Sequence, residues 1–255
     1  MLELQQRRDK ILEVLREAHE ISVNELLSRF KGISPASLRR DLRILEARGL
    51  VSRSYGSVTL ISSLQHPSNL ERKLSVHSGE KMRIAKAVAS LVKDGETLFF
   101  DTGSTALYVA RELRNHKGLM VITNSLPVAY ELGAIPYIRV VMTGGVYQHN
   151  EQCLVGSMAE QDIRSYKALK AIIGADGFTA ADGVTSHDPE NAGVTRAMVE
   201  CSEEVIVVAD YRKIGIRGVV PIASAEKVDI LVTNREAAQE EVEALEAKSV
   251  KVILC

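Results

Sequence analysis

The sequence predicts an α/β protein with a small N-terminal domain of helices and one β-hairpin, followed by a larger α/β domain. Two amphipathic patterns, a capped helix and a hairpin pattern follow one another in the first quarter of the chain. From about residue 78 onward, short apolar segments alternate with helical ones. The segment between these parts is polar and lacks a sustained periodicity. We therefore expect domains over residues 1–61 and 77–255 and a linker over residues 62–76.

The first two helices have clear signals in the sequence. Apolar side chains recur at helical spacing near the start of the chain, at Leu4, Ile11, Leu12 and Leu15. Ser22 is a good N-cap for a second helix, whose apolar side chains continue to Phe30. Residues 31–33 are then expected to form the turn before the next helix.

A third helix is predicted to begin at Ser34, a good N-cap, because Pro35 fits the first helical position, where no N–H group is needed. Its inward face is a stripe of three leucines, Leu38, Leu42 and Leu45. Its other face is small near the start and cationic beyond, with Ala36, Arg39, Arg40 and Arg43. Gly49 can end the helix in the left-handed conformation.

A β-hairpin is predicted after this helix, with strands over residues 50–53 and 58–61 and a turn over 55–57. Helix, helix, turn, capped helix and hairpin, in this order, form a winged helix-turn-helix, whose second helix enters the major groove of DNA. A cationic helix face can also be merely solvated, but the order of the elements favours DNA binding. The residues expected to contact DNA are Ser34, Ala36, Ser37, Arg39, Arg40, Arg43, Arg53 and Tyr55.

Charge is distributed unevenly along the chain. Residues 1–61 carry a net charge of +3 and the remaining residues carry −4, a difference that the overall charge of −1 hides. Between Arg29 and Arg53, seven basic residues are accompanied only by Asp41 and Glu46. Positive charge is therefore concentrated where contacts with DNA phosphates would form.

The composition is that of a protein with a sizeable core, since 45% of the 255 residues are hydrophobic. No apolar run is long enough to span a bilayer and no signal peptide is evident, so we expect a cytoplasmic protein without a membrane partner. The three cysteines are odd in number and widely separated, and the six histidines lack the spacing of metal ligands. We therefore expect no disulfide framework and no bound metal.

The C-terminal domain is predicted to contain a largely parallel sheet. Residues 80–92 form an amphipathic helix, Asp94 and Gly95 end it, and residues 97–100 form a short apolar strand. Six further strands are predicted over residues 120–123, 139–143, 169–173, 205–209, 229–232 and 250–254. Short apolar strands separated by helical segments are typical of parallel sheets.

Polar and glycine-rich segments follow these strands, at the edge of the sheet where ligands collect in open α/β folds. Residues 101–105 follow the first strand and begin a helix, so hydroxyl and backbone N–H groups would converge on an anion such as phosphate. Each segment could also be an ordinary turn or helix cap. The ligand-binding residues expected at these strand ends are Asp101, Gly103, Ser104, Thr105, Thr123, Asn124, Ser125, Gly144, Gly145, Asp176 and Lys213.

Other kinds of site have weaker signals. The polar loop over residues 182–190 could supply carboxylate or imidazole contacts, or could be only a surface turn. Neither the glycine motif of dinucleotide-binding folds nor that of P-loop nucleotide sites occurs, so no cofactor is expected. No combination of residues fixes a positioned general base, and no catalytic residue is predicted.

Segments in both halves of the chain match one known pattern. A signature helix and wing are matched by residues 37–42, 45–46 and 49–53. Loops of an effector domain are matched, in the right order, by residues 101–105, 123–125, 143–145, 174–177 and 210–213. With these segments, the chain resembles the DeoR family of bacterial transcriptional regulators. The resemblance implies a C-terminal domain similar in fold to ribose-5-phosphate isomerase, which senses a phosphorylated sugar or a related metabolite.

The chain departs from the family pattern at four places. The family's usual His-Gly-Gly-Ala at the wing tip is Tyr-Gly-Ser-Val at residues 55–58, and the turn at residues 31–33 is one residue longer than usual. Ser104 stands where a threonine is common, and Arg196 stands where a lysine is expected. Anion binding is expected to survive the last two changes.

The sequence therefore predicts a transcription factor that represses a carbohydrate-metabolism operon under the control of a phosphorylated sugar. Its partners would be double-stranded operator DNA, this effector and further copies of the chain in a dimer or tetramer. One alternative is a sugar-phosphate isomerase or transferase with a DNA-binding appendage, in which Asp176 or Glu190 acts as a base. Another is a DNA-binding assembly protein whose C-terminal domain binds no ligand.

Overall fold

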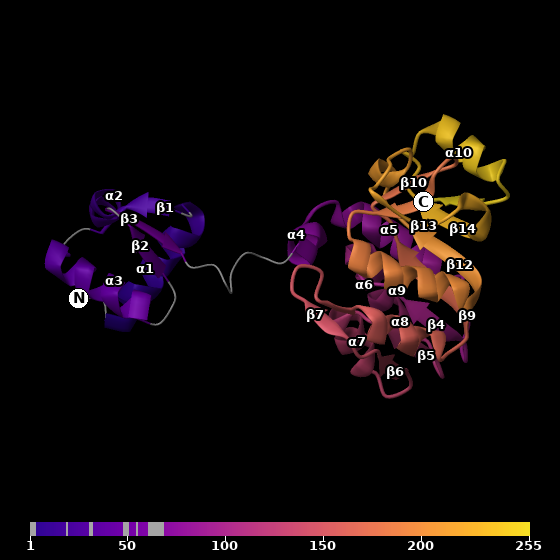
Figure 1. Cartoon of the computed structure of the whole chain (residues 1–255), viewed down its shortest axis with the longest axis horizontal. Coiled ribbons are helices and arrows are strands. Elements are labelled where there is room, and N and C mark those ends of the chain that lie inside the picture. Colours follow the sequence, from indigo (N-terminus) through magenta and orange to yellow (C-terminus); the bar gives the residue numbers. More distant parts are fainter. Residues whose placement is uncertain (1–3, 19, 31–32, 48–50, 55, 61–68) are drawn as a thin grey trace. The chain divides into compact units, whose positions relative to one another are not determined.

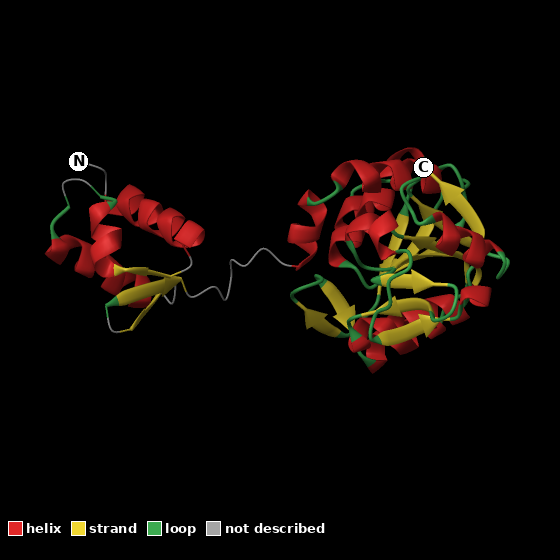
Figure 2. Cartoon of the chain, turned by 90° about the horizontal axis from the view of Figure 1, so that it is seen from above, coloured by secondary structure: helices red, strands yellow, loops and turns green. Residues whose placement is uncertain are grey.

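The computed structural model describes residues 4–18, 20–30, 33–47, 51–54, 56–60 and 69–255. The chain divides into two compact units, Met1–His66 and Pro67–Cys255, and the described residues of each form a hydrophobic core (Figures 1 and 2). The predicted helix end at Gly49 and the predicted DNA contact Tyr55 lie outside the described residues.

The elements described in the N-terminal unit are α1 (Leu4–Ala18), β1 (Glu20–Ser22), α2 (Val23–Ser28), α3 (Pro35–Ala47), β2 (Val51–Ser54) and β3 (Ser57–Leu60). The structure confirms both predicted helix caps. The Ser22 hydroxyl accepts the N–H of Glu25 at 3.1 Å, and the Ser34 hydroxyl accepts the N–H of Ser37 at 3.2 Å. Helix α2 ends slightly before its predicted end, and the two hairpin strands lie within one residue of their predicted ranges.

Strand β1 is an element that the sequence analysis missed. It pairs antiparallel with β3, which also pairs antiparallel with β2, so the strand order is β1-β3-β2. A strand of three residues is too short to show the alternation on which strand prediction depends. The hairpin is thus extended into a three-stranded sheet.

The core of the N-terminal unit contains one buried charge. Helix α3 buries the predicted stripe of Leu38, Leu42 and Leu45. Asp41, on the same helix, is also fully buried. Its carboxylate accepts the Nε–H of Arg7 at 2.6 Å and that of Arg8 at 3.0 Å. This cluster links α1 to α3 and satisfies the buried carboxylate.

The main sheet of the C-terminal unit consists of β4 (Thr97–Phe100), β5 (Met120–Thr123), β6 (Arg139–Met142), β9 (Ala168–Gly174), β12 (Ser202–Val208), β14 (Ile230–Thr233) and β15 (Lys251–Leu254). Their order is β15-β14-β12-β9-β4-β5-β6, and every neighbouring pair is parallel. These are the seven strands that the sequence predicts. The prediction of a largely parallel sheet is therefore confirmed.

The helices of this unit are α4 (Asn69–Ser75), α5 (Ser78–Ala89), α6 (Ser104–Glu112), α7 (Leu126–Gly133), α8 (Ser157–Arg164), α9 (Pro189–Glu200) and α10 (Gln239–Glu246), with short 3-10 helices η1 (Leu113–Asn115), η2 (Tyr211–Lys213) and η3 (Ala225–Lys227). They cover both faces of the sheet (Figure 2). Helices α5, α6 and α7 share a core with Leu98 and Phe100, whereas α8 and α9 share one with Phe99, because side chains alternate along β4. The carboxyl ends of the strands are left together at one edge.

Three further features of this unit were not predicted. A hairpin consists of β7 (Val146–Gln148) and β8 (Cys153–Val155), and a small antiparallel sheet consists of β10 (Gly177–Thr179), β11 (Gly183–Ser186) and β13 (Val220–Ala223). Helix α4 lies inside the segment predicted to be a linker, residues 62–76. A helix of two turns is too short to show a reliable period, and each of these strands is either only three residues long or interrupted by a polar, glycine or proline residue.

No helix in the part of the chain that the structure describes is both long enough and apolar enough to cross a membrane.

Candidate functional site

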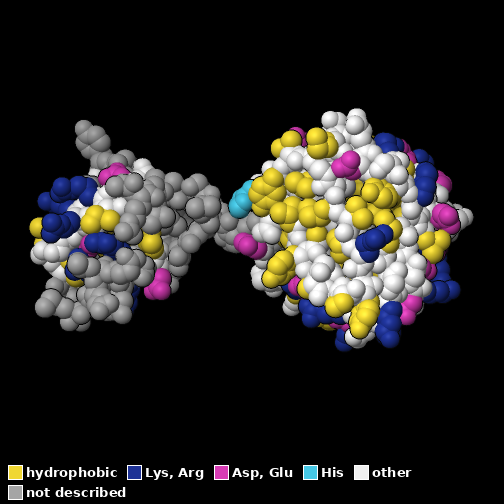
Figure 3. Space-filling model, turned by 90° about the horizontal axis from the view of Figure 1, so that it is seen from below, with side chains coloured by type: hydrophobic (Ala, Val, Ile, Leu, Met, Phe, Trp, Pro, Cys, Tyr) yellow, Lys and Arg dark blue, Asp and Glu magenta, His cyan; other side chains and the backbone are white. Residues whose placement is uncertain are grey.

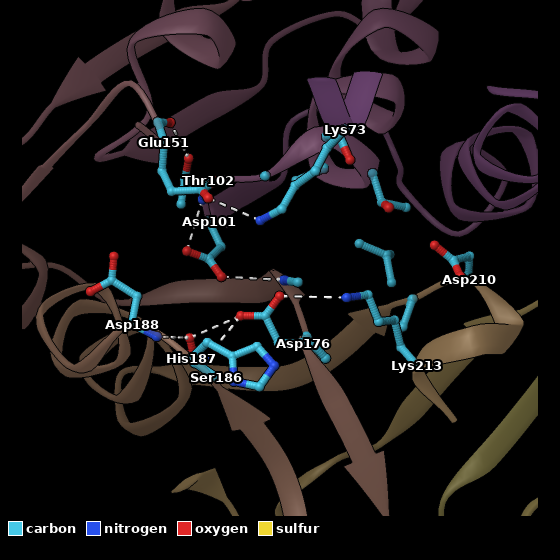
Figure 4. Close-up of a pocket in the computed structure, with 18 of the residues that line it drawn as sticks. Lys73, Asp101, Thr102, Glu151, Asp176, Ser186, His187, Asp188, Asp210 and Lys213 are labelled. Atoms are coloured by element: carbon cyan, nitrogen blue, oxygen red, sulfur yellow. Dashed lines mark hydrogen bonds and ion pairs between the residues drawn. The ribbon is translucent and has the colours of Figure 1, made fainter. Parts of the chain in front are cut away.

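A cavity of about 660 Å³ lies at the carboxyl ends of β4, β9 and β12 (Figure 4). This volume is in the range of small-molecule sites. Loops that follow the three strands form part of its wall, and α4, α5, α9, the turn between β7 and β8, and residues in or beside β11 and β13 also contribute. Six of the predicted ligand-binding residues line it, namely Asp101, Gly103, Ser104, Thr105, Asp176 and Lys213.

The first turn of α6 lies in the wall of this cavity. Gly103 precedes the helix with a φ of +117°, a conformation that favours glycine. Within the described residues, no side chain caps the N-terminus of α6, so the N–H groups of Ser104 and Thr105 have no side-chain acceptor. Free N–H groups and the helix dipole together favour an anion at this point.

Asp101 directly follows β4 and is the most constrained carboxylate of the cavity. It is 3% exposed and accepts hydrogen bonds from the N–H of Thr102 at 2.8 Å and of Gly174 at 3.3 Å. The side chains of Asn191 and Thr195 donate to it from α9 at 3.3 and 3.2 Å. Burial nevertheless raises the pKa of Asp101 to about 6. A carboxyl group in this position can accept or donate a hydrogen bond to a ligand hydroxyl near neutral pH.

Asp176 follows β9 and has the opposite electrostatic surroundings. The Lys213 ammonium lies 3.6 Å from its carboxylate, and the N–H of His187 and the hydroxyl of Ser186 donate to it at 3.0 and 3.3 Å (Figure 4). Burial alone would raise the pKa of Asp176, but the His187 N–H and the charges of Lys73 and Lys213 lower it below its usual value. Asp176 is therefore an ionised carboxylate that orients neighbouring groups.

The two carboxylates are expected to make the free energy of unfolding depend on pH in opposite directions. The folded chain binds the proton of Asp101 more tightly than the unfolded chain does, so stability falls as the pH rises from 3.8 to about 6. A pKa shift of this size corresponds to about 3 kcal/mol. Asp101→Asn cannot titrate and is expected to lack this loss, as measured by urea unfolding across that pH range.

Asp176→Asn is the matched control for that experiment. The lowered pKa of Asp176 means that its ionised form stabilises the fold above the ordinary pKa, and this contribution is lost as the pH falls. The difference in free energy of unfolding between the wild type and the variant should therefore change with pH in one direction for Asp101→Asn and in the opposite direction for Asp176→Asn. Parallel pH profiles for wild type and Asp101→Asn would contradict the assignment.

Several lining residues were missed by the sequence analysis. Helix α4 and the start of α5 contribute Asn69, Arg72, Lys73 and Lys81. The β7–β8 turn contributes Glu151, and α9 contributes Asn191 and Thr195. The positions of α4 and of the turn depend on tertiary contacts that no local pattern indicates. Asn191 and Thr195 lie four residues apart on one helix, a spacing that places two polar side chains on the same face and could have indicated them.

Three predicted residues at the end of β5 and just after it do not line the cavity. The Thr123 hydroxyl donates to the carbonyl of Phe100 at 2.7 Å, and Ser125 caps α7. Asn124 is buried and donates to the side chain of Asn191 at 3.0 Å. Asn124 thus supports a residue that holds Asp101, and the segment serves the local structure behind the cavity wall.

The two predicted glycines after β6 also lie away from the cavity. A Cβ atom at Gly144 would be 2.7 Å from the sulfur of Met158, and one at Gly145 would be 2.7 Å from the carbonyl oxygen of Val155. Gly145 has a φ of +135°. Close packing against β8 and α8 accounts for both glycines, so their place in the sequence reflects a tight turn.

The predicted DNA-contact face is mostly exposed. Ser34, Ala36 and the arginines of α3 are exposed, and Ser37 is half-buried. Arg39, Arg40 and Arg43 form no ion pair with any other residue that the structure describes. Figure 3 shows a group of Lys and Arg side chains on the N-terminal unit. Arg53 belongs to β2, but its side chain lies outside the described part of the structure.

Two protein-family models match the chain. The model of the DeoR-like helix-turn-helix domain matches residues 7–64. The model of the DeoR C terminal sensor domain matches residues 76–235. Together the two matches cover most of the sequence.

The chain is also similar to characterised regulators along nearly their whole length. The glycerol-3-phosphate regulon repressor of Escherichia coli (strain K12) is 30% identical over 98% of each chain. The HTH-type transcriptional regulator GolR of Listeria innocua is 32% identical over 91% of each chain. The transcriptional repressor AccR of Agrobacterium fabrum is 33% identical over 90% of this chain and 89% of its own.

Among solved structures, ribose 5-phosphate isomerase A of Methanocaldococcus jannaschii is 21% identical over 52% of each chain with a TM-score of 0.39, a value too low to support a conclusion. The assignment rests on the two family models and on the relatives, each of which is named as a regulator or repressor. The chain therefore belongs to the DeoR family of transcriptional regulators, with an N-terminal helix-turn-helix domain that binds DNA and a C-terminal sensor domain.

Proposed function

We propose that the chain represses an operon of carbohydrate metabolism in the cytoplasm and that a phosphorylated sugar or sugar derivative controls it. The observation that carries this proposal is the cavity, which is lined by Asp101, by the uncapped start of α6 and by Lys73 and Lys213. The positive groups suit a phosphate, and the carboxyl group suits a sugar hydroxyl. One relative is named for a regulon of glycerol 3-phosphate, a phosphorylated polyol.

Each part of the cavity has a distinct role in this proposal. Residues 103–105 hold the phosphate through backbone N–H groups and hydroxyls, and Lys213 adds positive charge. Asp101 forms the hydrogen bond to the sugar. In one state of the protein, the DNA-binding domains are misplaced for the operator. The effector binds this state more tightly than the DNA-binding state, and it lowers DNA affinity by the ratio of these two affinities.

The proposal predicts that a phosphorylated sugar binds at least tenfold more tightly than the same sugar without phosphate, which corresponds to roughly 1.4 kcal/mol. Thr105→Glu is expected to abolish this preference, because a carboxylate in the first turn of α6 would repel the phosphate and occupy its place. Calorimetry on the full-length wild type and on Thr105→Glu, with a panel of sugar phosphates and the matching free sugars, measures the preference of each protein.

Gln239→Glu is the matched control, because it adds the same charge at an exposed position in the first turn of α10, outside the cavity. It should keep the preference for the phosphorylated ligand. Equal affinities of the wild type for both forms, or an unchanged preference in Thr105→Glu, would place the anion site elsewhere.

The two carboxylates named for the enzyme alternative, Asp176 and Glu190, are poorly suited to act as its base. Asp176 is held by Lys213 and by two hydrogen-bond donors, and its lowered pKa makes it a weak base. Glu190 is exposed in the first turn of α9 and does not line the cavity. A general base must lie within hydrogen-bond distance of the substrate and must have a pKa near the working pH. Neither of these two carboxylates meets both conditions. The regulator is therefore the function that we propose.

We propose further that the chain forms a homo-oligomer through the side of the C-terminal unit that contains α7, β6, β7 and α8.

Figure 3 shows a broad apolar area on the C-terminal unit. Strand β6 is an edge of the main sheet. Met158 packs at Gly144, which lies in the chain between β6 and β7. Large apolar side chains exposed in or directly beside these elements are Tyr130, Tyr137, Met142, Val146, Tyr147 and Met158. Exposed tyrosine and methionine are typical of interface cores.

Replacing Val146 and Met158 together by Glu is expected to weaken self-association at least tenfold, because like charges would face one another in the interface. Sedimentation equilibrium measures the change. Val219→Glu is the control, since Val219 is 82% exposed and lies outside this surface. A monomeric wild type, or equal dissociation of the control, would refute the assignment of this surface.

A further inference from the structure

Helix α4 forms one wall of the effector cavity, although the sequence places it in a linker. Arg72, Lys73 and Asn69 all line the cavity from this helix. Figure 4 shows Lys73 and Lys213 reaching into the cavity from different elements of the fold. The loop at the start of α6 therefore faces a cavity that has cationic side chains from α4 as well as from η2.

This helix is held to the sensor unit at both of its ends. Near its start, the N–H of Leu70 donates to the carbonyl of Asn150 at 3.1 Å, and the Leu70 side chain is buried. Beyond its end, the buried Lys81 ammonium donates to the carbonyl of Val76 at 2.7 Å and also to that of Lys73. Helix α4 is thus part of the sensor fold, attached next to the β7–β8 turn and to α5.

Lys73 already forms an ion pair within the protein, so a ligand must displace that partner in order to bind the ammonium group. Its ammonium lies 2.9 Å from the Glu151 carboxylate, which also accepts a hydrogen bond from the Asn69 amide at 2.6 Å (Figure 4). Arg72 is exposed and forms no ion pair with any residue in the described part of the chain. An anion in the cavity would compete with Glu151 for the ammonium group of Lys73, whereas it could bind the guanidinium group of Arg72 without displacing an ion-pair partner.

We propose that α4 supplies the second half of the anion site, in which Lys73 and Arg72 bind the phosphate across the cavity from residues 103–105. This inference rests on the proposed sugar-phosphate function and adds how the ligand is sensed. Strand β3 of the DNA-binding unit ends at Leu60 and α4 begins at Asn69, so α4 is the first described element after the residues that join the units. A ligand bound to both walls stabilises one position of that helix.

The test uses the full-length chain, inorganic phosphate as the probe, and amide hydrogen exchange as the readout. In the wild type, phosphate should slow exchange both at Ser104 and Thr105 and along α4. Lys73→Met should weaken phosphate binding about tenfold, the usual effect of losing one charge-assisted hydrogen bond. At saturating phosphate this variant should keep the protection at the start of α6 and lose that of α4. Lys86→Met removes the same charge from an exposed position of α5 and should change neither the affinity for phosphate nor the pattern of protection.

A second variant separates ligand binding from a purely structural role. Glu151→Gln releases Lys73 from its ion pair and should strengthen phosphate binding, whereas loss of a structural contact would weaken it. In the Lys73→Met background, Glu151→Gln should have a smaller effect, because it acts through Lys73. Weaker binding in both single variants would overturn the proposal.

The same experiment distinguishes this inference from the function on which it rests. Protection by phosphate at the start of α6 without protection of α4 would overturn the role of α4 and leave the sensor function intact. Absence of protection at the start of α6 would show that the anion site itself is elsewhere.

Discussion

A variant in which Arg39 and Arg40 are both replaced by Ala is expected to bind operator DNA at least about 100-fold more weakly than the wild type and to unfold at the same temperature. Both side chains are exposed on α3, on the side away from the buried leucine stripe, so their removal leaves the core unchanged. Loss of one base contact costs about 1–3 kcal/mol, and two such losses reach about 100-fold in affinity.

DNA titrations at several salt concentrations separate the possible roles of the two arginines. Loss of a base contact lowers the preference for operator over random DNA, whereas loss of a phosphate contact weakens binding to both and lowers the salt slope. A variant with Lys86 and Lys227 replaced by Ala removes the same charge from exposed positions of the C-terminal unit and should bind normally. Unchanged operator affinity in the arginine variant would refute the recognition helix.

Asp41→Ala is expected to lower the free energy of unfolding of the N-terminal unit by about 3–5 kcal/mol, the range for breaking a buried ion pair on one side. Asp41 is fully buried and accepts hydrogen bonds from Arg7 and Arg8, so its loss leaves two guanidinium groups without their acceptor. A unit of this size has little stability to spare. Operator binding should therefore be lost together with the fold.

Circular dichroism of the thermal transition distinguishes this effect from that of the arginine variants. Arg43→Ala is the matched control, because Arg43 lies on the same helix and is exposed. A variant with Arg7 and Arg8 replaced by Met and Asp41 by Leu should recover much of the stability, since an apolar cluster can replace a buried ion pair. A normal transition in Asp41→Ala would show that the cluster is dispensable.

The local signals in the sequence were sufficient for most of the fold. Each of the seven main strands is a short apolar segment bounded by polar or glycine residues, and each lies in the parallel sheet. Ser22 and Ser34 marked helix starts through their hydroxyls, which cap the helices as expected. By contrast, β1, β7 and α4 have too few residues to show a period in the sequence.

The candidate site was predictable only where it follows the strands. Residues 101–105 line the cavity because parallel strands end at one edge of the sheet. The same rule wrongly suggested Thr123 and Gly144 as cavity residues, since strands near the sheet edge end beside the hairpin and α8. Lys73 and Glu151 come from distant segments that meet only in the folded chain, so no spacing in the sequence relates them.

The inclusion of α4 in the sensor fold sets a limit on the reach of the DNA-binding unit. A tether over residues 62–76 would allow a long span, but only residues 61–68 separate β3 from α4. Eight residues can extend over at most about 29 Å. The fifteen residues of the predicted linker, 62–76, would have allowed about 54 Å. The connection between the two units is therefore about half as long as the predicted linker would make it.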